Sequence, residues 1–215
     1  MRRKEKFITG EIYHVFNKSI AGYRIFNFDN NKLRFLQTLD YYNTLDRSYK
    51  LSIALKRNKY KFISLFNSNK NAVIKFISYV IMPNHYHLQI KVLKENCLSK
   101  YLNNIGSSYT KYFNIKNKRK GPLWQSPYKI IRVQNSEQVL HLSRYIHLNP
   151  TTSKLVRKPE NWKFSSYKEY LNNTSLLKKV LTEIVINNSM KYKAFVETRM
   201  DYQIKLKRLK KILLE

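Results

Sequence analysis

The segment from Tyr79 to Val92 constrains the fold of this chain more than any other stretch. From His85 onward polar and apolar residues alternate, and the apolar positions are Tyr86, Leu88, Ile90 and Val92. A period of two predicts a β-strand with one face on a core and the other face open. His85 and His87 then share the open face, about 6–7 Å apart at the backbone. Two such imidazoles can bind one small cation or one phosphate. They can equally be ordinary surface histidines, because a metal site needs a third ligand.

The residues around this strand predict an α+β fold with an antiparallel sheet. Residues 72–82 are apolar on both faces, as expected of a central strand, and Pro83-Asn84 predicts the turn of a hairpin that delivers His85. Further strands are predicted over residues 11–18 and 128–133. We interpret His14 in the first of these as a packed strand residue rather than a ligand.

Periodic apolar residues predict helices that flank the sheet. One helix begins at Asp29 or Asn30, which would act as its N-cap. Another spans residues 97–114, where Tyr109 and Tyr112 fall at core positions of an amphipathic pattern. Residues 48–71 fit neither the helical nor the strand period, so we expect a partly helical insertion there.

The charge of the chain predicts an anionic partner. Its 215 residues allow one principal domain, and 42 Lys and Arg against 13 Asp and Glu give a formal net charge of +29. Nucleic acid and an acidic membrane surface are the polyanions that such a charge attracts. No apolar run reaches the roughly 18 residues of a membrane-spanning helix. The single cysteine, Cys97, excludes an internal disulfide and suits a cytoplasmic protein, and the absence of a glycine-rich phosphate loop predicts no nucleotide cofactor.

A further helix is predicted over residues 135–148, with Asn135 as N-cap and Gln138 as its capping-box partner. Its apolar stripe consists of Val139, Leu142 and Ile146. A polar row borders this stripe and consists of Gln138, His141, Tyr145 and Asn149. We expect the row to face the edge of the sheet rather than bulk water. His147 falls about 160° from Tyr145 around the helix, so we expect it to face outward.

These parts suit metal-assisted phosphoryl transfer. A metal held by His85 and His87 would polarise a phosphodiester, and the hydroxyl of Tyr145 would attack it. A phenol ordinarily has a pKa of about 10, so at pH 7 it needs help from the metal-bound phosphate or from a neighbouring base. Asn149, one turn after the tyrosine, could supply a third ligand. Two imidazoles and an amide oxygen suit Mg²⁺ or Mn²⁺ better than a closed zinc site.

Three motifs follow one another along the chain, at Tyr79–Leu88, Gly121–Tyr128 and Arg144–Pro150. Together they resemble the single-tyrosine HUH transposases, most closely the REP-associated tyrosine transposases, over about residues 8–172. This resemblance implies an antiparallel ferredoxin-like sheet flanked by helices. It also implies that His85 and His87 are metal ligands, that Tyr145 is the nucleophile, and that Asn149, by position, is the third metal-site residue.

The resemblance implies cleavage of single-stranded DNA beside a hairpin, which leaves a 5′-phosphotyrosine and a free 3′-hydroxyl, followed by strand transfer. Residues 1–172 would form the catalytic domain and residues 173–215 a basic helical extension, whose last helix could contact DNA, dimerise or pack back. Expected DNA contacts come from basic, aromatic and amide side chains, namely Arg2, Arg3, Lys116, Lys118, Arg119, Lys120, Trp124, Gln125, Lys129 and Arg132. We expect a monomer rather than a homodimer, associated with the nucleoid.

Two other interpretations stay open. The first is a protein of the same fold that binds hairpin DNA or RNA without cutting it. The second is a structural RNA-binding protein of ribosomal type, which the charge allows but which does not explain the polar row around Tyr145.

Overall fold

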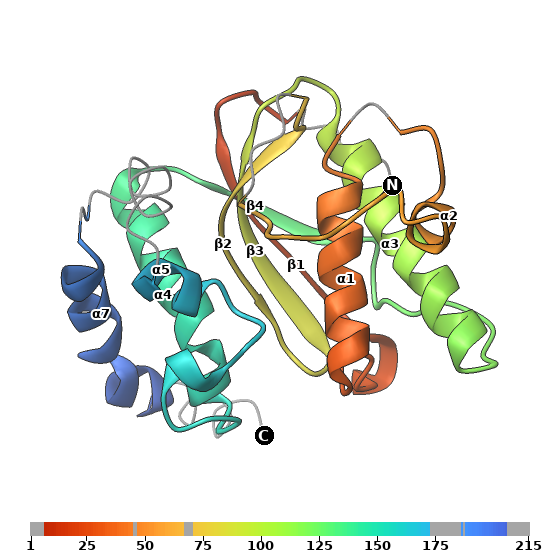
Figure 1. Cartoon of the computed structure of the whole chain (residues 1–215). Helices are drawn as coiled ribbons and strands as arrows, with labels where there is room; N and C mark the ends of the chain where they lie inside the picture. Colours follow the sequence, from red (N-terminus) through yellow and green to blue (C-terminus); the bar gives the residue numbers. More distant parts are fainter. Residues whose placement is uncertain (1–6, 45–46, 67–70, 173–185, 187, 206–215) are drawn as a thin grey trace.

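A computed structural model describes residues 7–44, 47–66, 71–172, 186 and 188–205. Within these residues, a four-stranded antiparallel sheet has the strand order β2-β3-β1-β4. Its strands are β1 (Ile12–Lys18), β2 (Ile74–Ile81), β3 (His85–Val92) and β4 (Lys129–Val133). Helices lie on both sides of the sheet (Figure 1). The predicted α+β class and the antiparallel ferredoxin-like sheet are therefore confirmed.

One face of the sheet is covered by α1 (Asp29–Tyr41) and α3 (Leu98–Lys116). The apolar positions of β3 face these helices, and Leu88 and Ile90 have no exposed surface. Tyr109 of α3 is also fully buried and donates a hydrogen bond to the carbonyl of Ile25, so its predicted packing role is confirmed. The predicted cap of α1 was wrong by one residue. The N-cap position belongs to Phe28, while Asp29 lies in the first turn.

The other face of the sheet is covered by α4 (Ser136–Thr152) and α5 (Tyr167–Asn172), and α7 (Ser189–Glu197) packs against these two helices (Figure 1). The polar face of β3 is therefore less open than the alternation predicted. Gln89 has no exposed surface and donates a hydrogen bond of 2.9 Å to the carbonyl of Val139 on α4. The two ends of this face, at His85 and Lys91, are partly exposed.

The strand β2 lies at the edge of the sheet, so the prediction of a central strand over residues 72–82 was wrong. Its outer edge is covered instead by an irregular segment, residues 164–166. Val80 pairs with Ser165 in an antiparallel bridge, and the N–H of Ile81 donates to the carbonyl of Phe164 at 2.9 Å. Helices bury β2 on both faces, and this burial gives an edge strand the apolar pattern of a central one.

The segment 48–71 contains one short helix, α2 (Leu51–Lys56), followed by irregular backbone in the part that the structure describes. The expectation of partial helicity is confirmed, and its status as an insertion stays a prediction. In the described ranges, no helix combines the length and the apolar character needed to cross a membrane.

Candidate active site

The two histidines of β3 lie on the face of the sheet that α4 covers. The ring centroids of His85 and His87 are 5.1 Å apart. A polar neighbour holds one nitrogen of each ring, since Asn84 Oδ1 lies 2.6 Å from His85 Nδ1 and His14 Nε2 lies 3.0 Å from His87 Nδ1. Metal-binding histidines usually have one ring nitrogen held in this way, because the contact fixes the tautomer and the ring orientation. Nε2 is then the atom through which each ring would bind a metal.

The register of β1 against β3 brings His14 into this site. Phe16 lies opposite His87 and His14 lies opposite Gln89, so all of these side chains share one face of the sheet. The rings of His14 and Phe16 stack with centroids 4.7 Å apart. Burial lowers the pKa of His14 to about 4, so its imidazole is neutral at pH 7. The interpretation of His14 as a packed strand residue missed its contact with His87, because only the strand register reveals it.

Tyr145 reaches the histidines from α4. This helix begins as predicted, with Asn135 Oδ1 accepting a hydrogen bond of 2.8 Å from the N–H of Gln138, and it continues to Thr152. The ring centroid of Tyr145 lies 5.5 Å from that of His87 and 6.4 Å from that of His14. The tyrosine is 44% exposed, which leaves it open to a substrate. The predicted proximity of Tyr145 and the histidine pair is confirmed, and its role as nucleophile stays a prediction.

The rest of the polar row does not behave as one unit. Asn149 is 4% exposed, one turn beyond Tyr145, whereas Gln138 and His141 are exposed. The expectation that the whole row avoids bulk water was therefore wrong for these two residues and for Tyr145, and it holds for Asn149. Instead of the sheet, the neighbours of His141 are the Glu137 carboxylate at 3.5 Å and the Arg144 guanidinium at 2.6 Å.

The available donors fit an exchangeable divalent cation. Within the described residues, no group of three or more His, Cys, Asp or Glu side chains is arranged to hold a metal ion, which argues against a closed site of zinc type. Two oriented imidazoles would leave coordination positions for water and for a phosphate oxygen. Mg²⁺ and Mn²⁺ suit such a set. The assignment of Asn149 as the third ligand stays a prediction.

His147 does not face outward, so that prediction was wrong. It has no exposed surface, its Nδ1 lies 2.8 Å from the hydroxyl of Tyr192 on α7, and its Nε2 lies 2.7 Å from Ser166 Oγ. The Tyr192 hydroxyl in turn donates to Ser143 Oγ at 2.8 Å. Burial lowers the pKa of His147 to about 3. The helix α4 is packed between the sheet and α7, so it has a second buried face that one apolar stripe does not predict.

Two predicted DNA-contact residues lie on β4, on opposite faces. Lys129 lies opposite Phe16 and therefore on the face of the histidines. Arg132 lies opposite Tyr13, on the other face, where its guanidinium pairs with Glu11 at 2.8 Å. Lys129 is thus placed beside the candidate site, and Arg132 is not.

The other predicted contacts lie at the end of α3, after α3, or outside the described residues. Lys116 donates to Asn31 Oδ1 at 2.7 Å, and the Arg119 guanidinium donates to Asn114 Oδ1 at 2.8 Å. The ring of Trp124 packs in the core, 5.6 Å from that of Tyr86. Internal contacts therefore account for these side chains. Lys118, Lys120 and Gln125 are exposed, and Arg2 and Arg3 lie outside the described residues.

Comparisons with known proteins give a family match and a similar fold. The family model for IS200-like transposases matches residues 48–149. A REP-associated tyrosine transposase, whose structure is bound to a REP hairpin, has a similar fold with a TM-score of 0.53 and 17% identity, over 79% of this chain and 84% of that chain. A proposed transposase from Deinococcus radiodurans R1 matches with a TM-score of 0.36 and 11% identity, over 68% of this chain and 95% of that chain, and this likeness is too weak to support an argument. Among curated proteins, none matches the chain significantly.

The family match includes the hairpin that carries His85 and His87 and the helix that carries Tyr145 and Asn149. The similar fold extends the likeness to most of the chain. The chain is therefore similar to the IS200-like transposases over residues 48–149, and its fold is similar to that of a REP-associated tyrosine transposase.

Proposed function

We propose that this chain cuts and rejoins single-stranded DNA beside a hairpin, with Tyr145 as the nucleophile. One observation carries the proposal, which is that an exposed tyrosine on α4 lies 5.5 Å from a histidine of an oriented pair on β3. The match of residues 48–149 to the family model for IS200-like transposases supports DNA as the substrate. The REP hairpin bound to the similar solved protein supports a hairpin as the neighbouring feature.

The reaction needs two displacements at one phosphorus atom. In the first, Tyr145 Oη attacks the phosphodiester, the bond from phosphorus to the 3′-oxygen breaks, and the departing oxygen takes up a proton to become a 3′-hydroxyl. The phenolic proton passes to water or to a phosphate oxygen. In the second, a 3′-hydroxyl attacks the same phosphorus, the bond to Tyr145 breaks, and the phenol recovers its proton.

The residues around Tyr145 have separate tasks in this scheme. His85 and His87 would hold a divalent metal, which when bound neutralises charge on the phosphate oxygens. Asn84 and His14 orient the two imidazoles through their Nδ1 atoms. Lys129, on the same face of the sheet, adds positive charge for the DNA backbone.

A covalent adduct tests the nucleophile directly. Wild-type protein, incubated with Mg²⁺ and single-stranded DNA from the flanks of its gene, should give a shifted band on a denaturing gel. Tyr145→Phe should give none while it binds the same DNA within a few fold. Tyr23→Phe is the matched control, because Tyr23 is also an exposed tyrosine, at 56%, and should leave the adduct unchanged.

The metal is tested separately. Excess EDTA or His87→Ala should stop adduct formation, and added Mg²⁺ or Mn²⁺ should restore it in the EDTA-treated wild type only. An adduct that persists with Tyr145→Phe would move the nucleophile to another residue. Binding of hairpin DNA by wild type, with no adduct under any metal condition, would favour the non-cleaving alternative.

A further inference from the structure

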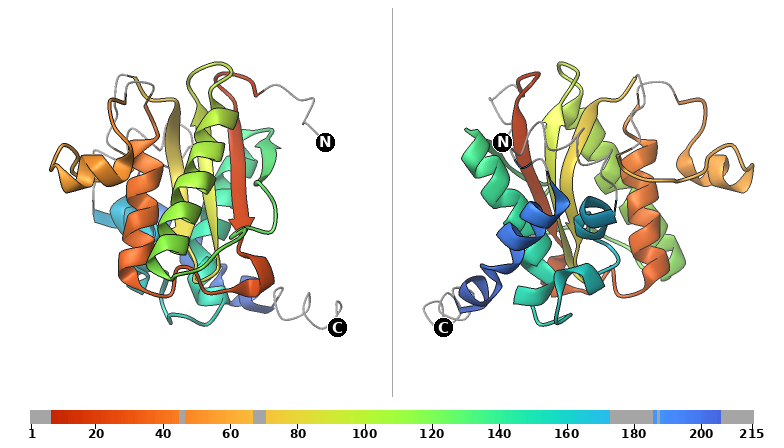
Figure 2. Two further views of the ribbon diagram at one scale, coloured as in Figure 1. Left: turned by 90° about the vertical axis from the view of Figure 1, so that its right-hand side faces the viewer. Right: turned by 60° about the vertical axis from the view of Figure 1, so that its left-hand side comes forward.

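A cavity of about 720 Å³ lies between α4 and the chain around the C-terminal end of α7. Its walls include His141 and Arg144 from α4, Phe195 from α7, and Arg199 and Tyr202 beyond α7. The helices α4 and α7 lie side by side in Figure 1 and in the right view of Figure 2. A cavity of this size is within the range of about 300–1,000 Å³ that is usual for small-molecule sites.

The cavity holds two guanidinium groups without an acidic partner. In the part of the chain that the structure describes, neither Arg144 nor Arg199 forms an ion pair, and the carboxylate of Glu137 contacts His141 instead. The Arg144 Nε–H is buried without a hydrogen-bond acceptor. Burial first, and then the charge of Arg199, lower the pKa of Arg144, so the two cations are close enough to repel. An anion between them would relieve this repulsion and accept the unused N–H group.

Aromatic rings support both guanidinium groups. The guanidinium carbon of Arg144 lies 4.3 Å from the ring centroid of Phe195, and that of Arg199 lies 5.8 Å from the ring centroid of Tyr202. The ring of Tyr202 is 55% exposed, so a nucleic-acid base could stack on it. Arginine beside an exposed aromatic ring is the combination that single-strand-binding grooves use.

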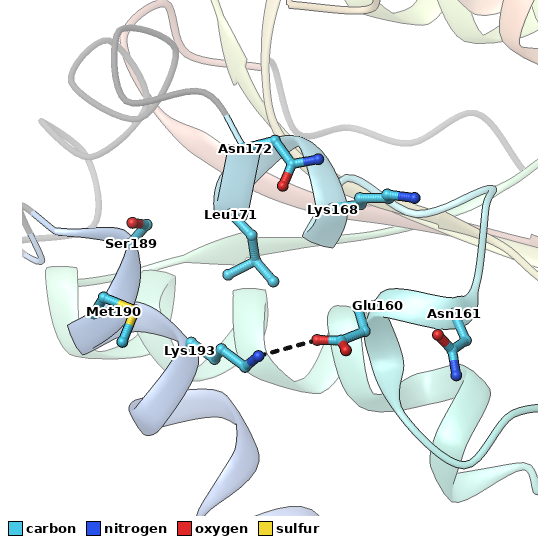
Figure 3. A pocket seen from close by; sticks show the side chains of 8 residues that line it. All are labelled: Glu160, Asn161, Lys168, Leu171, Asn172, Ser189, Met190 and Lys193. Carbon is cyan, nitrogen blue, oxygen red and sulfur yellow. Dashed lines mark ion pairs between the residues drawn. The ribbon is translucent and has the colours of Figure 1, made fainter.

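A second cavity, of about 420 Å³, also contains a cationic side chain, but the charge of that side chain is paired. It lies on another side of α7 and includes Lys193 and Glu160 (Figure 3). The Lys193 Nζ lies 3.2 Å from a Glu160 carboxylate oxygen and 3.9 Å from one of Glu197. Its charge is therefore already paired, unlike the charges of Arg144 and Arg199.

Two residues in the wall of the cavity that contains Arg144 and Arg199 lie within one helical turn of the candidate nucleophile, Tyr145, on α4. His141 precedes Tyr145 by four residues, so it lies about one helical turn away on the same side of α4. Arg144 directly precedes Tyr145 in the sequence. The wall from α7 is held to α4 by the buried hydrogen bonds of His147, Tyr192 and Ser143. DNA attached to Tyr145 would therefore have this cavity within reach.

We infer that Arg144 and Arg199 bind a phosphodiester of the DNA strand adjacent to the phosphate that Tyr145 attacks. This inference rests on the proposed function and adds a role for the chain around α7, which supplies one of the two cations. The ligand is a phosphate of bound single-stranded DNA, and the aromatic ring of Tyr202 receives the neighbouring base.

The main test compares two charge-removing variants from the same region. Arg199→Gln should weaken binding of single-stranded DNA about fivefold at 0.1 M salt and reduce the slope of log K against log salt by about 0.7, the value for one phosphate contact. Lys193→Gln removes a charge that is already paired and should change the slope by much less. Fluorescence anisotropy over a salt series measures both. Equal effects of the two variants would overturn the inference.

A substrate with one neutral linkage locates the contact. A methylphosphonate next to the cleavage position should weaken binding of wild type and leave Arg199→Gln nearly unaffected, because that variant has already lost the contact. Arg144→Lys keeps the positive charge but loses the Nε–H of arginine. Its affinities for the normal and the methylphosphonate DNA should therefore differ less than those of wild type. If the neutral linkage weakens wild type and Arg199→Gln equally, then Arg199 does not contact that phosphate.

The outcomes separate this inference from the proposed function. If wild type forms the adduct but Arg199→Gln behaves like Lys193→Gln, the cleavage function stands and the phosphate site falls. If Arg199→Gln lowers the slope while no adduct forms, the site binds DNA and the cleavage function falls. Inorganic phosphate at matched ionic strength should compete only weakly, and strong competition by it would refute a site specific for the DNA strand.

Discussion

Replacing His147 by glutamine should remove a pH dependence from the folding stability of this protein. His147 is fully buried between Tyr192 and Ser166, and burial lowers its pKa from 6.5 to about 3. The folded protein therefore keeps this imidazole neutral, whereas the unfolded chain protonates it below pH 6.5. The unfolded state then binds more protons between these two values, so the stability that His147 contributes is lost as the pH falls.

The size of the effect follows from linkage. Between pH 7 and pH 5, a histidine that titrates only in the unfolded state lowers the free energy of unfolding by about 2 kcal/mol. For a protein of this length, that loss corresponds to a fall of about 4–8 °C in Tm. Glutamine can accept and donate hydrogen bonds at this position but does not titrate. Between pH 7 and pH 5, the free energy of unfolding of the variant should therefore fall by about 2 kcal/mol less than that of wild type.

Urea unfolding followed by circular dichroism, at pH 7 and pH 5 in the presence of EDTA, measures the difference. The other titrating groups are common to both proteins, and their contributions cancel in the comparison of slopes. A general loss of stability in His147→Gln does not affect this comparison, because only the change between the two pH values counts. Identical changes in wild type and variant would mean that His147 takes up a proton in the folded protein, which refutes the buried network.

Three further outcomes are expected. Asn84→Ala should raise the metal concentration needed for half-maximal adduct formation about 10–100-fold, because His85 loses the contact that orients its ring; an unchanged metal dependence would contradict this role. Tyr192→Phe should lower the free energy of unfolding by about 1–3 kcal/mol, since it leaves buried polar groups of His147 and Ser143 unsatisfied; a Tm equal to that of wild type would argue against it. The affinity of wild type for single-stranded DNA should fall with salt at a log–log slope of about −4, as six phosphate contacts require; a flat response would exclude binding through the backbone.

The patterns of apolar residues predicted most of the sheet. They also predicted that Tyr145 lies close to His85 and His87. The alternation after His85 shows which side chains of β3 are apolar, and these are the side chains that pack on the core. One packing contact therefore determines both the strand and the side that each residue faces. The helical spacing that put Tyr145 beside an apolar stripe is equally local. The prediction of the strand and the prediction of the position of Tyr145 each depend on a single packing contact with an apolar surface. The structure contains both contacts.

Predictions that depend on a second partner were the ones that failed. β2 has the pattern of a central strand because helices bury both of its faces, and no residue in it reports which strand lies at its edge. His147 looked outward because the apolar stripe accounts for only one face of α4. Its partners, Tyr192 and Ser166, come from distant parts of the chain, so no local spacing could have indicated them. The contact of His14 with His87 was missed for the same reason, since strand register is a property of the assembled sheet.

The two edges of the sheet, at β2 and at β4, differ in how a strand from another molecule could pair with them. Residues 164–166 already occupy β2, so a strand from another molecule would have to displace them before it could add there. The edge at β4 carries Lys129 and Arg132, and the chain as a whole has a net charge of +29. Two copies that approach through β4 would repel each other, as charged edge strands commonly do. Under the proposed function, the charge of Lys129 at this edge would also help to hold the DNA strand on the histidine face.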